Sequence, residues 1–146
     1  MTDNDLILSV FRTARLHGRL FHSIMEDKGV DGGMHDGRIL HMLSEEDGIS
    51  QKELAGRMNI KPQSLTGTLE KLQEEGFIER HRSTVDKREL ILSITPLGLE
   101  REKVLTEVRN DTARKLFTIL DESEKRQLLD ILDKVSQQDL DLLINK

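Results

Sequence analysis

At 146 residues the chain has the length of one domain and is long enough to bury a core. No apolar run approaches the roughly 20 residues of a membrane-spanning helix, and the absence of cysteine excludes disulfides and thiolate metal sites. The acidic N-terminus lacks the basic start of a secretory signal, so we expect a cytoplasmic protein. A net charge of −5 disfavours nucleic-acid binding unless the basic residues gather in one place.

The N-terminal part of the chain predicts two helices. Apolar residues recur at every third or fourth position from Asp5 to about Gly29, which indicates an amphipathic helix with a wide apolar face. A glycine-rich stretch ends it, and a shorter helix follows from Met34 to Leu43. Residues 44–48 have the composition of a turn.

Residues 50–60 predict a short helix and a tight turn. Ser50 and Glu53 have the spacing of a capping box, in which each side chain accepts from the other residue's backbone N–H. Apolar residues follow at helical spacing. Asn59 then tolerates the left-handed conformation that a tight turn requires.

A second helix is expected from Pro62 to just before Gly76. Proline suits the first helical position because its missing N–H needs no partner there. The helix would bury three leucines and expose small polar residues near its N-terminus. Two short helices joined in this way indicate a helix-turn-helix, whose second helix enters the major groove of DNA.

A β-hairpin is expected directly after this helix. Residues 77–82 have the composition of a strand, and residues 90–94 alternate as a half-buried returning strand does. Between them, residues 83–88 form a polar, charged tip. From Ser50 to Thr95 there are eight Lys or Arg and seven Asp or Glu, so this region carries about +1 and the remainder −6. The positive charge gathers on the hairpin, and counterion release depends on such local contacts. A helix-turn-helix with a basic-tipped hairpin is a winged helix.

Five stretches in this region carry a family resemblance. They are Gly48-Ile49-Ser50-Gln51-x-x-Leu54-Ala55, Lys61-Pro62-Gln63-Ser64-Leu65-Thr66, Leu72-x-x-x-Gly76-Phe77-Ile78-Glu79-Arg80, Asp86-x-Arg88 and Leu92-Ser93-Ile94-Thr95-Pro96-x-Gly98. Together they resemble the multiple-antibiotic-resistance regulator (MarR) family. The Asp-x-Arg wing followed by Thr-Pro-x-Gly is the specific part. Lys61 departs from the family's frequent serine cap, and Gly67 from a frequent arginine.

The resemblance implies a mainly α-helical fold with a small β-hairpin wing, an α+β winged helix-turn-helix. We expect a single domain over residues 1–146, with the winged helix at 35–95 and dimerisation helices at 5–30 and 96–144. It further implies a DNA-binding transcriptional regulator, a ligand-responsive repressor that binds a pseudo-palindromic operator as a homodimer. In the family the wing arginine lies at the DNA and the aspartate supports the wing, roles that fall here on Arg88 and Asp86.

The candidate DNA-binding residues lie on the second helix and the hairpin. Gln63 suits adenine, the hydroxyl side chains suit phosphates, and the cations suit the backbone. The alternative is that these are ordinary solvated side chains. The full set is Lys61, Gln63, Ser64, Thr66, Lys71, Arg80, Arg82, Lys87 and Arg88.

The C-terminal third predicts two long helices. Thr95-Pro96 begins one that extends to about Leu120, and the capping box Asp121–Glu124 begins a last one. Together with the first helix, these helices are too apolar for the core of one winged helix. Apolar surface that one chain cannot cover implies a partner, and a two-fold homodimer would bury it.

A small-molecule effector pocket is implied by the resemblance alone, in the cleft between the dimerisation helices and the winged helix. Such a pocket would be aliphatic and methionine-rich, and therefore adaptable. The alternative is that the apolar members are only core. Its candidate lining is Phe11, Arg15, Phe21, Met25, Met34, Arg38 and Met42.

Other functional classes find less support in the sequence. His22 and Glu26 are four residues apart, yet no histidine pair has the HxxxH spacing of a metal site, so we expect no metal and no cofactor. There is no nucleophile elbow, phosphate loop or HExxH motif, so we expect no enzyme. Two alternatives stay open: a winged-helix protein-interaction module without specific DNA binding, and a metal-responsive regulator of the same fold.

Overall fold

The computed structural model describes residues 1–145, with the side chains of all of them except Met34 and His35. Helices dominate, and a small three-stranded sheet accompanies them, which confirms the predicted mainly α fold with a wing. The elements are α1 (Asp3–Asp27), α2 (Met34–Glu45), β1 (Ile49–Ser50), α3 (Gln51–Arg57), α4 (Pro62–Glu74), β2 (Ile78–Arg82), β3 (Leu90–Ile94), α5 (Pro96–Phe117), α6 (Glu122–Ser136) and α7 (Leu140–Ile144).

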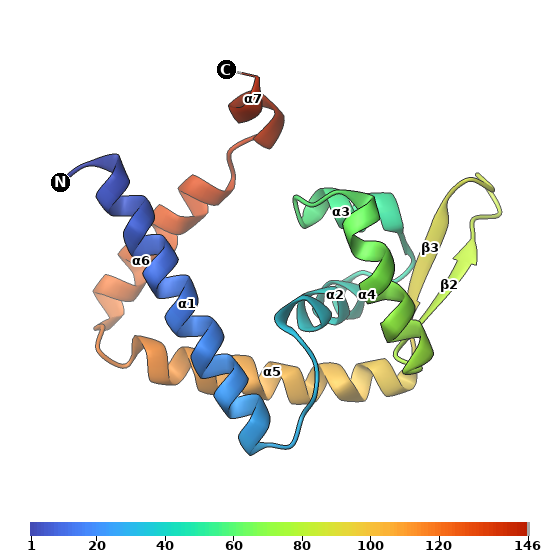
Figure 1. The fold of residues 1–146 in the computed structure, drawn as a ribbon, viewed down its shortest axis with the longest axis horizontal. Helices are drawn as coiled ribbons and strands as arrows, with labels where there is room; N and C mark the ends of the chain where they lie inside the picture. The colour runs from blue at the N-terminus through green and yellow to red at the C-terminus, as the bar shows by residue number, and fades with distance from the viewer. Residues whose placement is uncertain (146) are drawn as a thin grey trace.

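The molecule has two parts joined by α5 (Figure 1). Helices α2, α3 and α4 and the β2–β3 hairpin gather along the part of α5 next to the hairpin, while α1 packs across the other part of α5 and α6 follows its far end. Both chain termini lie on the side of α1 and α6, away from the hairpin. The long helix α5 therefore connects the winged helix to the terminal helices.

The sheet has the order β1-β3-β2, and both pairings are antiparallel. The β2–β3 register places Arg80 opposite Leu92 and Arg82 opposite Leu90. The sequence did not predict β1, whose two residues pair with Leu92 and Ile91 of β3. Two residues are too few to show an alternating pattern, so only the partner strand defines β1.

The hydrophobic core lies inside the winged helix and reaches one end of α1. Helix α4 contributes its three leucines, and α5 contributes Leu105 and Val108. Helix α1 contributes only residues of its C-terminal third, namely Phe21, Ile24 and Met25. The remaining members are Ile39, Leu40, Leu43, Ile49, Leu54, Ala55, Met58, Ile78 and Leu92.

The terminal helices leave much apolar surface exposed. On α1 and the α6–α7 segment the exposed large apolar residues are Leu6, Ile7, Leu8, Val10, Phe11, Leu16, Leu129, Ile131, Leu132, Val135, Leu140, Leu142, Leu143 and Ile144. No residue of α6 or α7 is buried. Among the described residues, no helix combines the length and apolar character needed to cross a membrane.

The last predicted helix is interrupted. The Asp121–Glu124 capping box is present, with Glu124 N donating to Asp121 Oδ1 over 2.9 Å. After α6, however, Asp139 caps a separate helix by accepting from the backbone N–H groups of Asp141 and Leu142. Aspartate competes for backbone donors in this way, which favours a new N-terminus over a continuous helix.

Helix α5 begins in direct contact with the wing. The Thr95 hydroxyl donates to the Gly76 carbonyl (2.6 Å) and accepts from Gly98 N (3.0 Å), which caps the helix. Thr95 N also donates to the Phe77 carbonyl over 3.0 Å. This contact couples the base of the hairpin to the helix that connects the two parts of the molecule.

Candidate nucleic-acid interface

The turn between α3 and α4 adopts the conformation that its residues predict. Asn59 has φ +53°, and the backbone N–H of Ile60 donates to the Ala55 carbonyl over 3.1 Å. Pro62 is the first residue of α4, while the Lys61 side chain makes no capping bond. The turn therefore presents the N-terminus of α4 outward, with exposed residues before and after it.

The predicted capping box at Ser50 is only half formed. The Ser50 hydroxyl accepts from Glu53 N over 3.0 Å, as expected. The Glu53 carboxylate instead accepts from Arg57, which also donates to Glu46 over 2.6 Å. These bonds raise the pKa of Arg57, through Glu46 first, and the Arg57 side chain lowers the pKa of Glu46. Arg57 thus connects the end of α3 to the loop before β1.

Contacts on the two flanks of α4 define the orientation of this helix. Lys71 Nζ lies 3.7 Å from Asp36 Oδ2 of α2 on one flank. On the other flank, Gln73 Oε1 accepts from Arg80 Nε of β2 over 2.6 Å. The face between these flanks is directed away from the core, and its residues Gln63, Gly67, Glu70 and Glu74 are exposed.

The predicted DNA-binding residues therefore fall into two groups. Lys71 and Arg80 have intramolecular partners, and Arg82 Nη1 donates to the Lys87 carbonyl over 3.0 Å. Lys71 and Arg82 nevertheless stay exposed. The other candidates lie at the N-terminus of α4 and at the hairpin tip, all of them exposed and Arg88 paired with Asp86 of the same tip: Lys61, Gln63, Ser64, Thr66, Lys87 and Arg88. Sequence periodicity separates buried from exposed positions but cannot reveal these partners, which come from other elements.

The hairpin tip is ordered by its own side chains. The Ser83 hydroxyl accepts from the backbone N–H groups of Val85 and Asp86. Asp86 Oδ1 accepts from Arg88 N (3.0 Å) and from Arg88 Nε (3.2 Å). The Arg88 side chain, and then its backbone N–H, hold the pKa of Asp86 below its ordinary value. Asp86 thus orients Arg88, whose side chain is 91% exposed.

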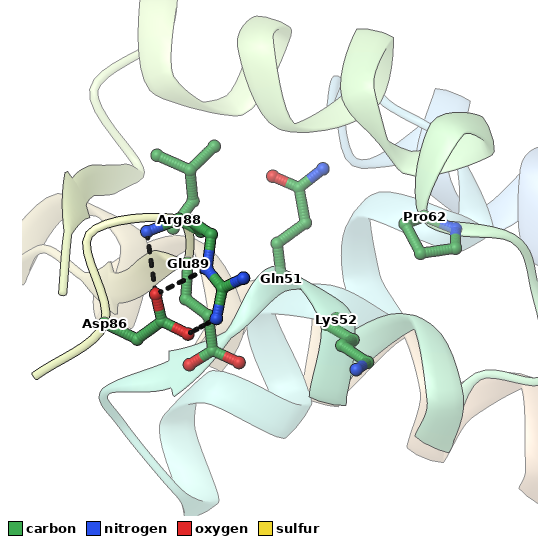
Figure 2. Close-up of a pocket in the computed structure, with 7 residues that line it drawn as sticks. Gln51, Lys52, Pro62, Asp86, Arg88 and Glu89 are labelled. Atoms are coloured by element: carbon green, nitrogen blue, oxygen red, sulfur yellow. Dashed lines mark hydrogen bonds and ion pairs between the residues drawn. The ribbon is translucent and has the colours of Figure 1, made fainter.

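A cleft of about 490 Å³ separates the hairpin tip from the start of α3 and α4. Figure 2 shows Asp86 and Arg88 paired on one side of it and Pro62 on the other. Gln51 lies between them, and its Oε1 atom is buried without a hydrogen-bond partner among the described residues. The remaining lining residues are Lys52, Glu89 and Leu90. An open cleft with charged residues along its lining, between a wing and a helix-turn-helix, is a surface that an elongated charged partner can span.

The candidate effector residues do not share one environment. Phe21 and Met25 are buried in the core, and Met42 packs partly buried against it. Phe11, Arg15 and Arg38 are exposed. The side chain of Met34 lies outside the described residues. A cleft formed by all of them would therefore need core side chains to move.

Two of the histidines, which are the residue type that a metal site would use, make ordinary polar contacts. His22 pairs with Glu26 over 3.1 Å on the surface of α1, and His41 Nδ1 lies 3.0 Å from Glu102 Oε1. The side chain of His35 lies outside the described residues. Within the described part of the chain, no group of three or more His, Cys, Asp or Glu residues is arranged to hold a metal ion.

The sequence did not predict the partners that position the interface. Asp36 holds Lys71, Gln73 holds Arg80, and Asp47 Oδ1 accepts from Ile94 N over 2.8 Å beside the base of the hairpin. It also did not predict the role of Glu102, a buried carboxylate of α5 that contacts His41 of α2. The spacing of Glu102, Thr106 and Arg109 on one helical face is a signal that indicates this cluster.

Comparison with known proteins links this geometry to a family. Residues 34–90 match the model of the MarR family. The "HTH-type transcriptional regulator BilQ" of Clostridium symbiosum is 33% identical over 95 residues, which cover 65% of this chain and 66% of that protein. Across five such relatives the matched segment spans between 48% and 73% of their own length.

Solved structures show the same fold over most of the chain. A mutant MarR from E. coli complexed with operator DNA superposes with a TM-score of 0.81 at 21% identity, covering 90% of this chain and 93% of that one. The transcriptional regulator BldR of Sulfolobus solfataricus superposes with a TM-score of 0.80 at 25% identity, covering 91% and 93%. The likeness therefore includes the terminal helices as well as the winged helix.

Proposed function

This chain belongs to the MarR family of winged helix-turn-helix proteins, and we propose that it is a DNA-binding transcriptional repressor that acts as a homodimer. The observation that carries the proposal is the pairing of the exposed outer face of α4 with the ordered, arginine-bearing hairpin tip. An α-helix fits the major groove, and a basic wing reaches the neighbouring backbone or minor groove. Gln63, Ser64, Thr66, Lys61, Lys87 and Arg88 are the proposed contacts.

The homodimer follows from the apolar surface of the terminal helices. Monomeric soluble proteins rarely expose contiguous apolar patches of this extent, and a second copy of the same chain would cover α1, α6 and α7. Helix α5 connects those helices to the winged helix (Figure 1), so the dimer geometry would set the distance between the two α4 helices. A spacing of roughly 34–36 Å matches one turn of DNA and a near-palindromic operator.

We expect Leu132→Glu to convert the dimer to monomer, because it places a charge on the exposed apolar face of α6. Sedimentation velocity at micromolar concentration measures the change, and DNA affinity should fall with it. Lys134→Glu, exposed on the same helix, is the control and should stay dimeric. A wild-type protein that sediments as a monomer at these concentrations would contradict the dimer.

We expect Arg88→Ala to weaken binding to all DNA sequences and to lower the slope of log affinity against log salt by about 1, since one phosphate contact is lost. Arg88→Lys keeps the charge and should restore most of the slope. Lys103→Ala, which removes an exposed charge from α5, is the control and should change neither quantity. Unchanged affinity and slope in the alanine variant would remove Arg88 from the interface.

Repression would be relieved by a small molecule that shifts the population of DNA-competent dimers. The candidate lining combines adaptable core side chains, Met25 and Met42, with the exposed cations Arg15 and Arg38, which suits an acidic or phenolic compound with an apolar body. Thermal-shift screening with phenolic and lipophilic compounds tests this proposal. Failure of every compound to stabilise the protein would leave these residues with a purely structural role.

A protein-interaction module is the second candidate function, and the exposed carboxylates Glu70 and Glu74 on α4 favour it. Fluorescence-anisotropy titration with DNA from the protein's own upstream region, at two salt concentrations, separates the two functions. Tight, salt-dependent binding that survives competitor DNA supports an operator-binding repressor. Weak, sequence-independent binding in both salts would contradict it and favour a protein partner.

A further inference from the structure

The outer face of α4 has an unusual chemistry for a surface that meets DNA. The contacts of Lys71 with Asp36 and of Gln73 with Arg80 direct the two flanks of the helix to α2 and β2. The face left between them includes Gln63, Thr66, Gly67, Glu70 and Glu74 and contains no lysine or arginine. Any contact there with a nucleic acid must therefore rely on hydrogen bonds rather than on charge attraction.

Gly67 makes this face hollow at its centre. An ideal Cβ at Gly67 would meet no described heavy atom within 4 Å, so nothing fills the space beside it. Glu70 lies three residues further along the helix, on the same side, and its side chain is exposed. Glu70 is also closer than Glu74 to the N-terminal part of α4, which is the part that reads base edges in helix-turn-helix proteins. Gly67 thus places no side chain between the Glu70 carboxylate and a base edge in the groove.

We propose that Glu70 is a specificity-determining residue that selects cytosine in each half of the operator. An ionised carboxylate only accepts hydrogen bonds, so it needs a donor on the base edge. In the major groove guanine presents the acceptors N7 and O6, and thymine presents O4 and a methyl group. Adenine has an amino group but also the acceptor N7, whereas cytosine presents its N4 amino group alone. This inference rests on the proposed DNA-binding function, and it adds the base that Glu70 would recognise.

Selection from a library of randomised DNA duplexes tests the inference with the full-length protein. Wild-type protein should enrich a two-fold symmetric sequence with cytosine at one position of each half. Glu70→Gln should change the preference at that position from cytosine to adenine, because glutamine pairs with adenine N6 and N7. The matched control is Glu75→Gln, which removes the same charge from an exposed residue just past the end of α4. This control variant should keep the preference for cytosine.

Affinities for the selected duplex and for its cytosine-to-adenine variant complete the test. The wild-type protein should prefer cytosine by about tenfold or more, and Glu70→Gln should lose or reverse this preference. A uniform gain in affinity for every sequence in both variants, with the base preferences unchanged, would overturn the inference, because it reflects only reduced repulsion from phosphates. Enrichment of no sequence by the wild-type protein would instead overturn the proposed function and this inference with it. Equal melting temperatures of the three proteins would verify that the exposed substitutions leave the fold intact.

Discussion

Replacing Gly98 with alanine is expected to lower the free energy of unfolding by about 3 kcal/mol, the upper end of the usual cost of overpacking. An ideal Cβ at Gly98 would clash with the carbonyl oxygen of Phe77 and lie 2.7 Å from Ile94 Cγ1. The obstructing atom belongs to the backbone, so it cannot move without the strand that follows. Urea denaturation monitored by circular dichroism measures the loss.

The clash also involves the hydrogen bonds that couple the hairpin to α5. The Phe77 carbonyl accepts from Thr95 N, and Gly98 N donates to the Thr95 hydroxyl. Gly56→Ala is the matched control, because no heavy atom lies within 4 Å of an ideal Cβ there and the residue is within α3. Alanine at that helical position should stabilise the protein by up to about 1 kcal/mol. Equal stability of the Gly98→Ala and wild-type proteins would mean that helix and hairpin separate easily.

Replacing Arg109 with glutamine is expected to lower the free energy of unfolding by about 2–3 kcal/mol, because it leaves a buried carboxylate without its main cation. Glu102 is only 6% exposed, and its Oε1 atom accepts from Arg109 Nη2 (2.5 Å) and Thr106 Oγ1 (2.9 Å). His41 of α2 lies 3.0 Å from the same oxygen. This expected loss of unfolding free energy is smaller than the usual loss for a buried ion pair, because the Arg109 side chain is itself 31% exposed.

The matched variants distinguish an ion pair from simple packing. Glu102→Gln removes the buried charge and leaves an arginine that water can still reach, so it should cost only about 1 kcal/mol. The double variant should be more stable than Arg109→Gln alone, because no buried charge is left unpaired. Equal and additive losses in the two single variants, measured by urea denaturation, would contradict this account.

Local rules were enough to predict most helices and the wing. Asn59 and Gly76 both have positive φ, at +53° and +82°, and each ends a helix where the sequence indicated. Pro62 begins α4, and the capping box at Asp121 begins α6. These features depend on one residue or on a few neighbouring residues. Their backbone preferences therefore hold without any contact to a distant part of the chain.

The features that the sequence did not predict have two different causes. The strand β1 exists only because Ile49 and Ser50 pair with β3, some forty residues later in the chain. Glu53 completes no capping box because Arg57 offers its carboxylate a stronger, charged donor. Helix α7 is separate from α6 because Asp139 captures two backbone donors. The strand β1 thus needs a distant partner, whereas in the other two cases a competing local interaction outweighed the expected pattern.

By itself the sequence determined the winged helix-turn-helix, the order of its elements and which polar residues of α4 and the hairpin reach the surface. Tertiary structure decided which of those residues meet partners on other elements: Asp36 contacts Lys71 and Gln73 contacts Arg80, whereas Arg88 pairs with Asp86 within the hairpin tip. It also decided that Glu102 is buried and that Gly98 touches the hairpin. The physical reason is that exposure follows from periodicity within one helix, whereas an ion pair or a close approach requires two elements to meet.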